Sequence, residues 1–347
     1  MPKVTIIGTT SWGITLGTIL ARNEVLVELW ARTEQEANRL TKNGVNHGEK
    51  CPAQLSVNSS MSEVMADTTA VILVVPSQSM RENMKLVAEH LEQSTIIISA
   101  AKGLEIGSNK RMSQVIADEI DPSLHSNICI LSGPNLSQEI LDELPSATVI
   151  SAADEKIARQ AQKILTTPKF CVFTNTDIVG VELGGALKNI IALGAGIADG
   201  LGYGDNTKAA LITRGLTEMT ALGVSLGANP LTFSGLAGLG DLMATCASPL
   251  SRNHYVGVEL TKGRPLKEIT DSMDGIAEGV GTTMVVWKLA HEMELEMPIT
   301  ETIHRILFED ADIHQAAIEL MTAGTAHELA GRKWRLFHFL QRRWRRQ

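Results

Sequence analysis

Two lysines stand where their side chains could move protons or bind anions. Lys188 lies in GGALKNIIAL (residues 184–193), where one charge interrupts an apolar pattern with helical spacing. Burial lowers the pKa of a lysine and suits it to proton transfer. Lys102 ends the apolar run STIIISAAKG, and ligands of parallel sheets lie at the carboxyl ends of strands. The alternatives are a Lys188 that extends to the surface and a solvated Lys102.

A phosphate-sized anion site is predicted further along, in GLAGLGDLMATCASPLSRN (residues 235–253). Gly-rich backbone leads to Asp241 and Thr245, and a helical pattern begins after the last three residues. Ser251, Arg252 and Asn253 would place hydroxyl, guanidinium and amide donors beside a helix N-terminus, where an anion is favoured. The alternative is that Ser251 only caps the helix.

A glycine-containing turn after the first apolar run could hold the pyrophosphate of a dinucleotide. The turn runs from Gly8 to Gly13 after KVTII, and a helical segment follows it. Both glycines match the GxGxxG pattern, but Thr10 takes the middle position, where a Cβ would crowd the phosphate or force an unfavourable φ. The alternative is a tight strand–helix turn in another doubly wound fold.

The end of the second predicted strand bears on the choice of cofactor. The run VLVELWAR ends in Arg32, and Glu34 comes two residues later, so no acid is expected at the strand end itself. An acid there would bind the ribose 2′-hydroxyl of NAD, whereas an arginine favours the 2′-phosphate of NADP. Arg32 therefore favours NADP, unless it only stacks on the adenine.

These residues need a scaffold, and the hydrophobic pattern predicts one in two parts. Val- and Ile-rich runs alternate with helical patterns up to about residue 178, as in a parallel sheet covered on both faces. After that point strand signals are few, and Ala, Gly, Leu and Met recur at helical spacing. We expect a Rossmann-type α/β domain over 1–178, a helical substrate domain over 179–330 and a separate tail over 331–347.

Composition excludes several classes of protein. A net charge of −8 argues against a nucleic-acid binder. No transmembrane run, secretory leader or metal-ligand spacing is evident, and four scattered cysteines fit a reducing cytoplasm. The tail has seven basic residues, no acid and several aromatics, which indicates either a peripheral membrane contact, a helix packed on the acidic body or an unstructured extension.

The sequence as a whole resembles the NAD(P)-dependent glycerol-3-phosphate dehydrogenases of the bacterial cytosolic type. The matching segments run in order over nearly all of residues 3–330. They are SWG at 11–13, LWAR at 29–32, VVPS at 74–77, AKGLE at 101–105, LSGP at 131–134, the long stretch at 180–219, GLAGLGDL at 235–242, SRN at 251–253, AEG at 277–279 and EMPITE at 296–301.

The resemblance implies interconversion of dihydroxyacetone phosphate and sn-glycerol 3-phosphate with NADPH or NADH, which supplies glycerol 3-phosphate for glycerophospholipid synthesis. Lys188 would be the general acid and base, assisted by Lys102. Implied substrate contacts are Lys102, Gly133, Asn135, Asn189, Asp241, Thr245, Ser251, Arg252 and Asn253. Implied cofactor contacts are Gly8, Ser11, Trp12, Gly13, Arg32, Lys102, Ser137, Arg252, Ile276 and Glu278. A cytoplasmic homodimer is usual for the family.

The departures from the family lie on the cofactor side. Thr10 replaces a glycine, Asn135 stands where Ser or Thr is usual, and Ser137 where Ala is usual. The segment 46–52 also lacks the tyrosine of the family's N-x-x-Y-L-P motif. Two alternatives remain open, a binding protein that senses triose phosphate or dinucleotide without turnover, and a hydroxyacyl-CoA or 6-phosphogluconate type of dehydrogenase. The Lys188 context and the Ser-Arg-Asn triplet argue against the second.

Overall fold

The first half of the computed structural model is one eight-stranded sheet with helices on both faces. The structure describes residues 1–43, 52–273 and 275–322. The strand order is β3-β2-β1-β4-β5-β6-β7-β8, so the order reverses beside β1, where doubly wound sheets hold their ligands. The strands are β1 Lys3–Ile7, β2 Leu26–Trp30, β3 Leu55–Asn58, β4 Ala70–Leu73, β5 Ile96–Ser99, β6 Ile128–Ser132, β7 Ser146–Ala152 and β8 Phe170–Asn175.

Alternation along each strand creates two hydrophobic layers. In β1, Ile6 packs into one cluster and Ile7 into another on the opposite face. Short helices cover these layers. They are α1 Ser11–Arg22, α2 Glu34–Asn43, α3 Met61–Met65, α4 Met80–Ala88, α5 Met112–Glu119, α6 Ser137–Leu141 and α7 Glu155–Leu165, with 3-10 turns η1 Ser77–Ser79 and η2 Pro122–Asn127.

The expectation of a parallel sheet needs one correction. β7 runs antiparallel to β6, while β8 is parallel to β7. The connection from β6 to β7 contains only the five-residue α6, which rises about 7.5 Å. That is too short to carry the chain back along the sheet, so β7 starts from the edge where β6 ends. The eleven residues of α7 restore the parallel direction for β8.

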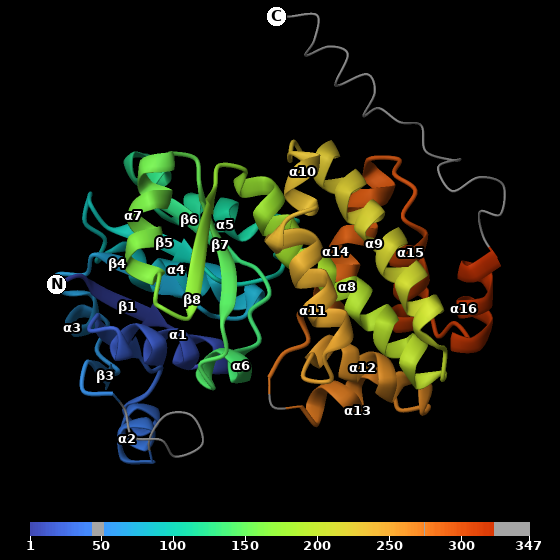
Figure 1. Cartoon of the computed structure of the whole chain (residues 1–347), viewed down its shortest axis with the longest axis horizontal. Helices are drawn as coiled ribbons and strands as arrows, with labels where there is room; N and C mark the ends of the chain where they lie inside the picture. Colours follow the sequence, from blue (N-terminus) through green and yellow to red (C-terminus); the bar gives the residue numbers. More distant parts are fainter. Residues whose placement is uncertain (44–51, 274, 323–347) are drawn as a thin grey trace, which may run out of the picture.

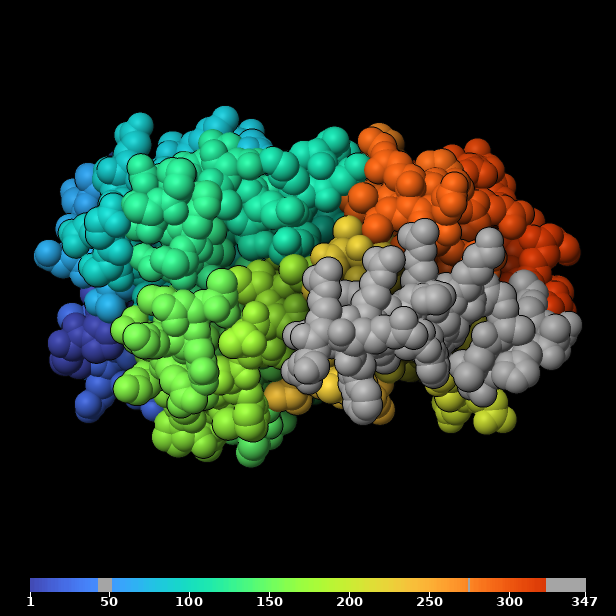
Figure 2. All heavy atoms as spheres, turned by 90° about the horizontal axis from the view of Figure 1, so that it is seen from above, coloured from blue at the N-terminus to red at the C-terminus, as the bar shows by residue number. Residues whose placement is uncertain are grey.

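Within the described residues, every element after β8 is helical. These elements are α8 Ile178–Gly200, α9 Asp205–Ser225, α10 Pro230–Phe233, the π-helical turn η3 Leu236–Gly240, α11 Asp241–Ala247, α12 Arg252–Thr261, α13 Leu266–Asp271, α14 Glu278–Glu292, α15 Pro298–Phe308 and α16 Ile313–Thr322. Most of them pack against α8, while α13 packs on α12 and α16 on α15. Figure 1 shows these helices on one side and the sheet on the other. Figure 2 shows the same division from above, with blue to green atoms on one side and orange to red atoms on the other.

Helix α8 forms the core of the helical part and packs against α9, α11, α12 and α14, as well as against β6. Among the described residues it is the one helix long and apolar enough to cross a membrane, but 89% of its most apolar stretch is buried inside the protein. It is therefore the central helix of a globular core. Its contact with β6 brings its middle turns to the carboxyl ends of the strands.

Candidate active site

The side chain of Lys188 lies inside the protein, in the middle of α8. Only 6% of the residue is exposed. Its Nζ donates to the carboxylate of Asp241 and to Thr245 Oγ1, the latter at 2.6 Å. Asp241 and Thr245 lie one turn apart on α11 and so share a face. The prediction of a buried Lys188 is confirmed, and the alternative of a lysine that extends to the surface is wrong.

The second predicted lysine contacts the same carboxylate. Lys102 follows β5, and its Nζ donates to Asp241 Oδ2 at 2.7 Å and to the carbonyl oxygen of Gly133 at 2.8 Å. β5 and β6 are parallel neighbours, so the residues that follow them meet at one edge of the sheet. Two cations therefore share one buried anion, which leaves a net positive charge suited to an anionic substrate.

Lys188 is poised to exchange its proton. Burial lowers the pKa of Lys188 to about 8, because the ammonium loses its hydration inside the protein. Asp241 opposes this effect by stabilising the ammonium, and Lys102 adds to it by repulsion between like charges. An amine with a pKa near the ambient pH can act as both acid and base.

Close approach of backbone segments depends on small residues in α8. A Cβ at Gly184 would lie 2.3 Å from the carbonyl oxygen of Ala237, and one at Gly185 would lie 2.3 Å from Ser132 Oγ. A side chain at Gly184 would push α8 away from η3, and one at Gly185 would displace the Ser132 hydroxyl at the end of β6. The η3 segment is π-helical and ends immediately before Asp241, and such turns are frequent at functional sites.

A chain of amide hydrogen bonds fixes this geometry. Asn189 Nδ2 donates to the carbonyl oxygen of Lys102 at 3.1 Å, and Asn253 Nδ2 donates to Asn189 Oδ1 at 2.9 Å. Asn253 Oδ1 in turn accepts from the backbone N–H of Gly279 at 2.9 Å. The chain ties the segment after β5 to α8, α12 and α14, so Asn189 and Asn253 hold the two lysine-bearing segments in register.

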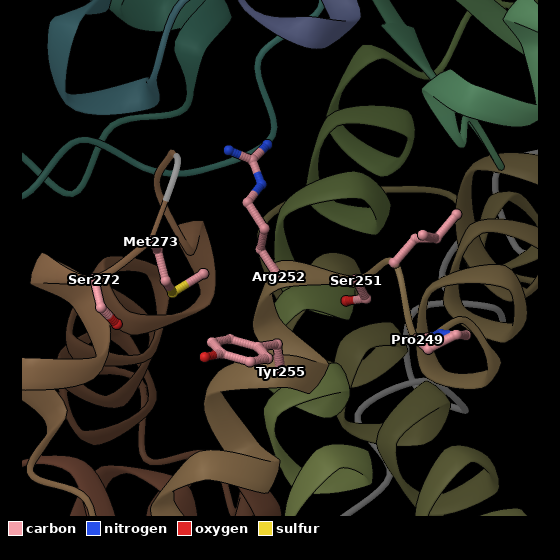
Figure 3. A pocket seen from close by; sticks show the side chains of 7 residues that line it. Pro249, Ser251, Arg252, Tyr255, Ser272 and Met273 are labelled. Atoms are coloured by element: carbon pink, nitrogen blue, oxygen red, sulfur yellow. The ribbon is translucent and has the colours of Figure 1, made fainter. Parts of the chain in front are cut away.

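The Ser-Arg-Asn triplet divides into three different environments. Ser251 caps α12, because its Oγ accepts from the N–H of His254 at 3.3 Å. The alternative that Ser251 acts as a helix cap is therefore confirmed. Asn253 is buried in the amide chain. Arg252 is exposed, and in Figure 3 its side chain projects away from Tyr255 and Met273. A cavity of about 300 Å³ lies here, lined by Pro249, Leu250, Ser251, Arg252, Tyr255, Ser272 and Met273.

The predicted phosphate loop has the shape that a pyrophosphate requires. Gly8 has φ +117°, and a Cβ there would lie 2.7 Å from the carbonyl oxygen of Val74. A Cβ at Gly13 would lie 2.2 Å from the carbonyl oxygen of Gly8. Only glycine fits both positions, and the turn leads directly into the N-terminus of α1, which favours an anion. The loop therefore fits a dinucleotide.

One expectation for the middle of this loop is wrong. Thr10 has φ −67° and ψ 160°, which any residue adopts, so it is not held in an unfavourable φ. It is the N-cap of α1, because its Oγ1 accepts from the N–H of Gly13 at 3.2 Å, and it donates to the carbonyl oxygen of Val74 at 3.0 Å. A residue that replaces the usual glycine thus has a structural role of its own.

Two buried polar atoms without a hydrogen-bond partner among the described residues belong to α1 and to the segment after β6. These atoms are Trp12 Nε1 and Asn135 Oδ1. The Nδ2 atom of Asn135 donates to Thr148 Oγ1 at 3.0 Å. Ser11 is exposed in the first turn of α1, and Ser137 begins α6. Such atoms are available to a bound ligand.

The start of α14 is joined to the sheet domain. Glu278 accepts from the backbone N–H of Ser77 at 2.8 Å and from its hydroxyl, just after β4. Burial raises the pKa of Glu278 above its usual value. Ile276, two residues earlier, is 49% exposed. Ser77 was not identified as a contact by the sequence, although it ends the VVPS segment at 74–77.

The end of β2 differs from the expectation. Arg32 is exposed, as a cofactor contact would be. The prediction that no acid lies at this strand end is wrong, because the carboxylate of Glu36 reaches back from α2. It accepts from Thr9 Oγ1 at 2.6 Å and from the backbone N–H of Arg32 at 3.1 Å. The spacing Thr33-x-x-Glu36, typical of a capping box, was the signal that could have revealed it.

Two predicted features lie outside the described residues. These are most of the altered motif at 46–52 and the basic tail at 331–347.

Comparison with known proteins assigns the family. Two family models match, NAD-dependent glycerol-3-phosphate dehydrogenase N-terminus over residues 3–158 and C-terminus over residues 177–318. A glycerol-3-phosphate dehydrogenase [NAD(P)+] of Dehalococcoides mccartyi is 59% identical over 99% of this chain and 97% of its own length. One from Geobacter metallireducens is 45% identical over 92% and 97%. The crystal structure of glycerol-3-phosphate dehydrogenase from Coxiella burnetii superposes with a TM-score of 0.87 at 35% identity, covering 92% of this chain and 99% of that one. With both halves matched in order, the chain belongs to the NAD-dependent glycerol-3-phosphate dehydrogenase family.

Proposed function

We propose that this protein interconverts dihydroxyacetone phosphate and sn-glycerol 3-phosphate with NADH or NADPH, and that Lys188 moves the proton. The observation that carries the proposal is the buried amine of Lys188, with a pKa of about 8, on a carboxylate that it shares with Lys102. When bound, the nicotinamide supplies or accepts the hydride, and the protein supplies orientation and charge.

Lys188 acts as the acid during reduction. Its ammonium gives a proton to the carbonyl oxygen of the substrate as negative charge develops there, and the neutral amine takes the hydroxyl proton in the reverse direction. Asp241 and Thr245 hold the amine at a fixed point by accepting its other hydrogen bonds. The positive charge of Lys102 stabilises the developing alkoxide.

The phosphate end of the substrate needs a separate group. Arg252 is the exposed cation at the edge of the cavity at the start of α12, and a guanidinium binds phosphate with two parallel hydrogen bonds. Ser251 and Asn253 contribute by fixing the helix start from which Arg252 extends. The remaining proposed substrate residues are Gly133, Asn135 and Asn189.

The cofactor would lie along the turn between β1 and α1. Its pyrophosphate would lie on the Gly8–Gly13 loop, and Arg32 would contact its adenosine end. The other proposed contacts are Ser11, Trp12, Lys102, Ser137, Arg252, Ile276 and Glu278. We keep the division into a cofactor domain over 1–178 and a substrate domain over 179–330 as part of this proposal.

The substitution Lys188→Met tests the proposal. Oxidation of NADH or NADPH is followed by absorbance with dihydroxyacetone phosphate as substrate, and we expect a loss of at least about a hundredfold in kcat. Lys267→Met is the matched control, because Lys267 is an exposed lysine of α13 that pairs with Asp271 one turn along the same helix. Undiminished turnover in a folded Lys188→Met sample would refute the mechanism, and no turnover in the unchanged protein would favour a binding protein without catalysis.

The cellular setting is part of the same proposal. A cytoplasmic homodimer would supply glycerol 3-phosphate for phospholipid synthesis, and the basic aromatic tail at 331–347 would hold it near an anionic membrane. Co-sedimentation with vesicles containing anionic lipid compares the full chain with one that ends at residue 330. Equal sedimentation of the two would eliminate the membrane contact.

A further inference from the structure

Glu36 joins the ends of two neighbouring strands. Its Oε1 accepts from Thr9 Oγ1 in the phosphate loop at 2.6 Å, and its Oε2 accepts from the N–H of Arg32 at 3.1 Å. The last residues of β1 and β2, Ile7 and Trp30, are partners in the sheet. The carboxylate therefore lies between the loop that fits the pyrophosphate and the strand end where the adenosine ribose lies in this class of fold.

A hydrogen bond of the Glu36 backbone also helps to fix the carboxylate in this position. The N–H of Glu36 donates to Thr33 Oγ1 at 3.2 Å, which fixes the first turn of α2. Each carboxylate oxygen accepts one hydrogen bond from the protein and keeps a lone pair for a second. Glu36 can therefore accept from a ribose hydroxyl without giving up its present contacts.

We propose that Glu36 discriminates between the two cofactors and favours NADH. This inference rests on the proposed function, because it concerns the cofactor that the reaction uses. A fixed carboxylate accepts a hydrogen bond from the 2′-hydroxyl of NADH but repels the doubly charged 2′-phosphate of NADPH. Arg32 acts in the opposite sense at the same strand end, so the two residues set the ratio of the affinities together.

Direct binding tests this without turnover. NADH and NADPH are titrated calorimetrically into the unchanged protein, Glu36→Gln and Glu34→Gln. Glutamine keeps the length and planar shape of Glu36 and removes its charge. Its carbonyl oxygen can still accept from the N–H of Arg32, and its amide nitrogen can face the hydroxyl of Thr9, which can accept as well as donate. Glu34 belongs to the same first turn of α2 and is exposed. Glu34→Gln therefore measures the effect of removing one charge nearby, and the melting temperature of each variant verifies its fold.

In Glu36→Gln we expect NADPH to bind about tenfold more tightly, because a charge repulsion is removed. We expect NADH to bind several-fold more weakly, because a hydrogen bond to a neutral amide is weaker than one to a carboxylate. Glu34→Gln should leave the ratio of the two dissociation constants within about twofold, as for a screened surface charge. Equal changes for both cofactors in Glu36→Gln would overturn the inference and assign Glu36 a purely structural role. Failure of the unchanged protein to bind either cofactor would instead refute the proposed function, and this inference with it.

Discussion

Replacement of Asp241 by asparagine should move the pH dependence of the reaction in a defined direction. The carboxylate of Asp241 accepts from both Lys188 and Lys102, and asparagine has nearly the same shape without the charge. Burial lowers the pKa of Lys188 to about 8 even though Asp241 stabilises the ammonium. Without that stabilisation, the amine should lose its proton at a lower pH.

The size of the effect follows from the contact distance. Two unit charges about 3 Å apart interact by roughly 5 kcal/mol at an effective dielectric constant of about 20. The asparagine carbonyl and local relaxation recover part of this, so we take about half, which is about 2 pKa units. The pKa of Lys188 would then fall from about 8 to near 6. At neutral pH roughly a tenth of the molecules would hold the ammonium that reduction needs, which is about a tenfold loss from protonation alone.

The assay is kcat/KM against pH in both directions. In the unchanged protein, reduction should fall as the pH rises through about 8, and oxidation should rise over the same range. Asp241→Asn should shift both limbs to lower pH, and Lys188→Met should lack them. Circular dichroism and melting temperature verify that the variants fold. A limb that stays near pH 8 or moves upward in Asp241→Asn would show that Lys188 is not the titrating group or that Asp241 is not its counter-charge.

Three further predictions concern the cofactor loop and the helical core. Thr10→Gly should tighten NADPH binding by removing the Cβ that would crowd the pyrophosphate, yet lower stability by a few tenths of a kcal/mol through loss of the side-chain cap on α1. Equal or weaker binding in a calorimetric titration would contradict the first part. Arg32→Ala should weaken NADPH more than NADH, and equal losses would indicate stacking on the adenine. Burial raises the pKa of Glu218 from 4.5 to about 7, although the N–H groups of Ile299 and Thr300 donate to it. The folded state then keeps a proton that the unfolded chain releases, so stability should be greatest below about pH 4.5 for this group and fall as the pH rises to about 7. Glu218→Gln should flatten that part of a plot of melting temperature against pH, and an unchanged slope would refute the assignment.

The main division of the fold follows from patterns that are local in sequence. Apolar runs rich in Val and Ile predicted the strands, and α8 begins at Ile178, where the helical pattern was seen to begin. The direction of β7 could not be read in this way, because it depends on how far the five residues of α6 carry the chain. The short strand β3 was also missed, since LSVN at 55–58 is too brief and too polar to separate from a loop.

The candidate site shows the same limit at the level of single residues. Lys102 and Lys188 could be predicted because each has an unusual charge beside an apolar run, and one carboxylate brings them together. Glu36 was not predicted, since its role depends on a side chain that turns back from α2 onto a strand end, and the capping-box spacing from Thr33 was the one local signal for it. Glu36 is six residues past the end of β2 in the sequence. The first turn of α2 nevertheless brings its carboxylate back to Arg32 at that strand end.

A charged amine in the middle of an apolar helix needs both a counter-charge and an opening to the ligand, and two glycines of α8 let the segments that provide them come close. Gly184 lets the carbonyl oxygen of Ala237 approach α8, which sets the segment that ends at Asp241. Gly185 lets the end of β6 approach, which sets Gly133 as a partner for Lys102. Gly184 and Gly185 precede Lys188 by one turn of α8. The glycines that allow the close packing and the lysine that reacts therefore belong to the same helix. Burial lowers the pKa of Lys188 and the charges of Asp241 and Lys102 act on it in opposite directions, so the packing that the two glycines allow bears directly on the chemistry.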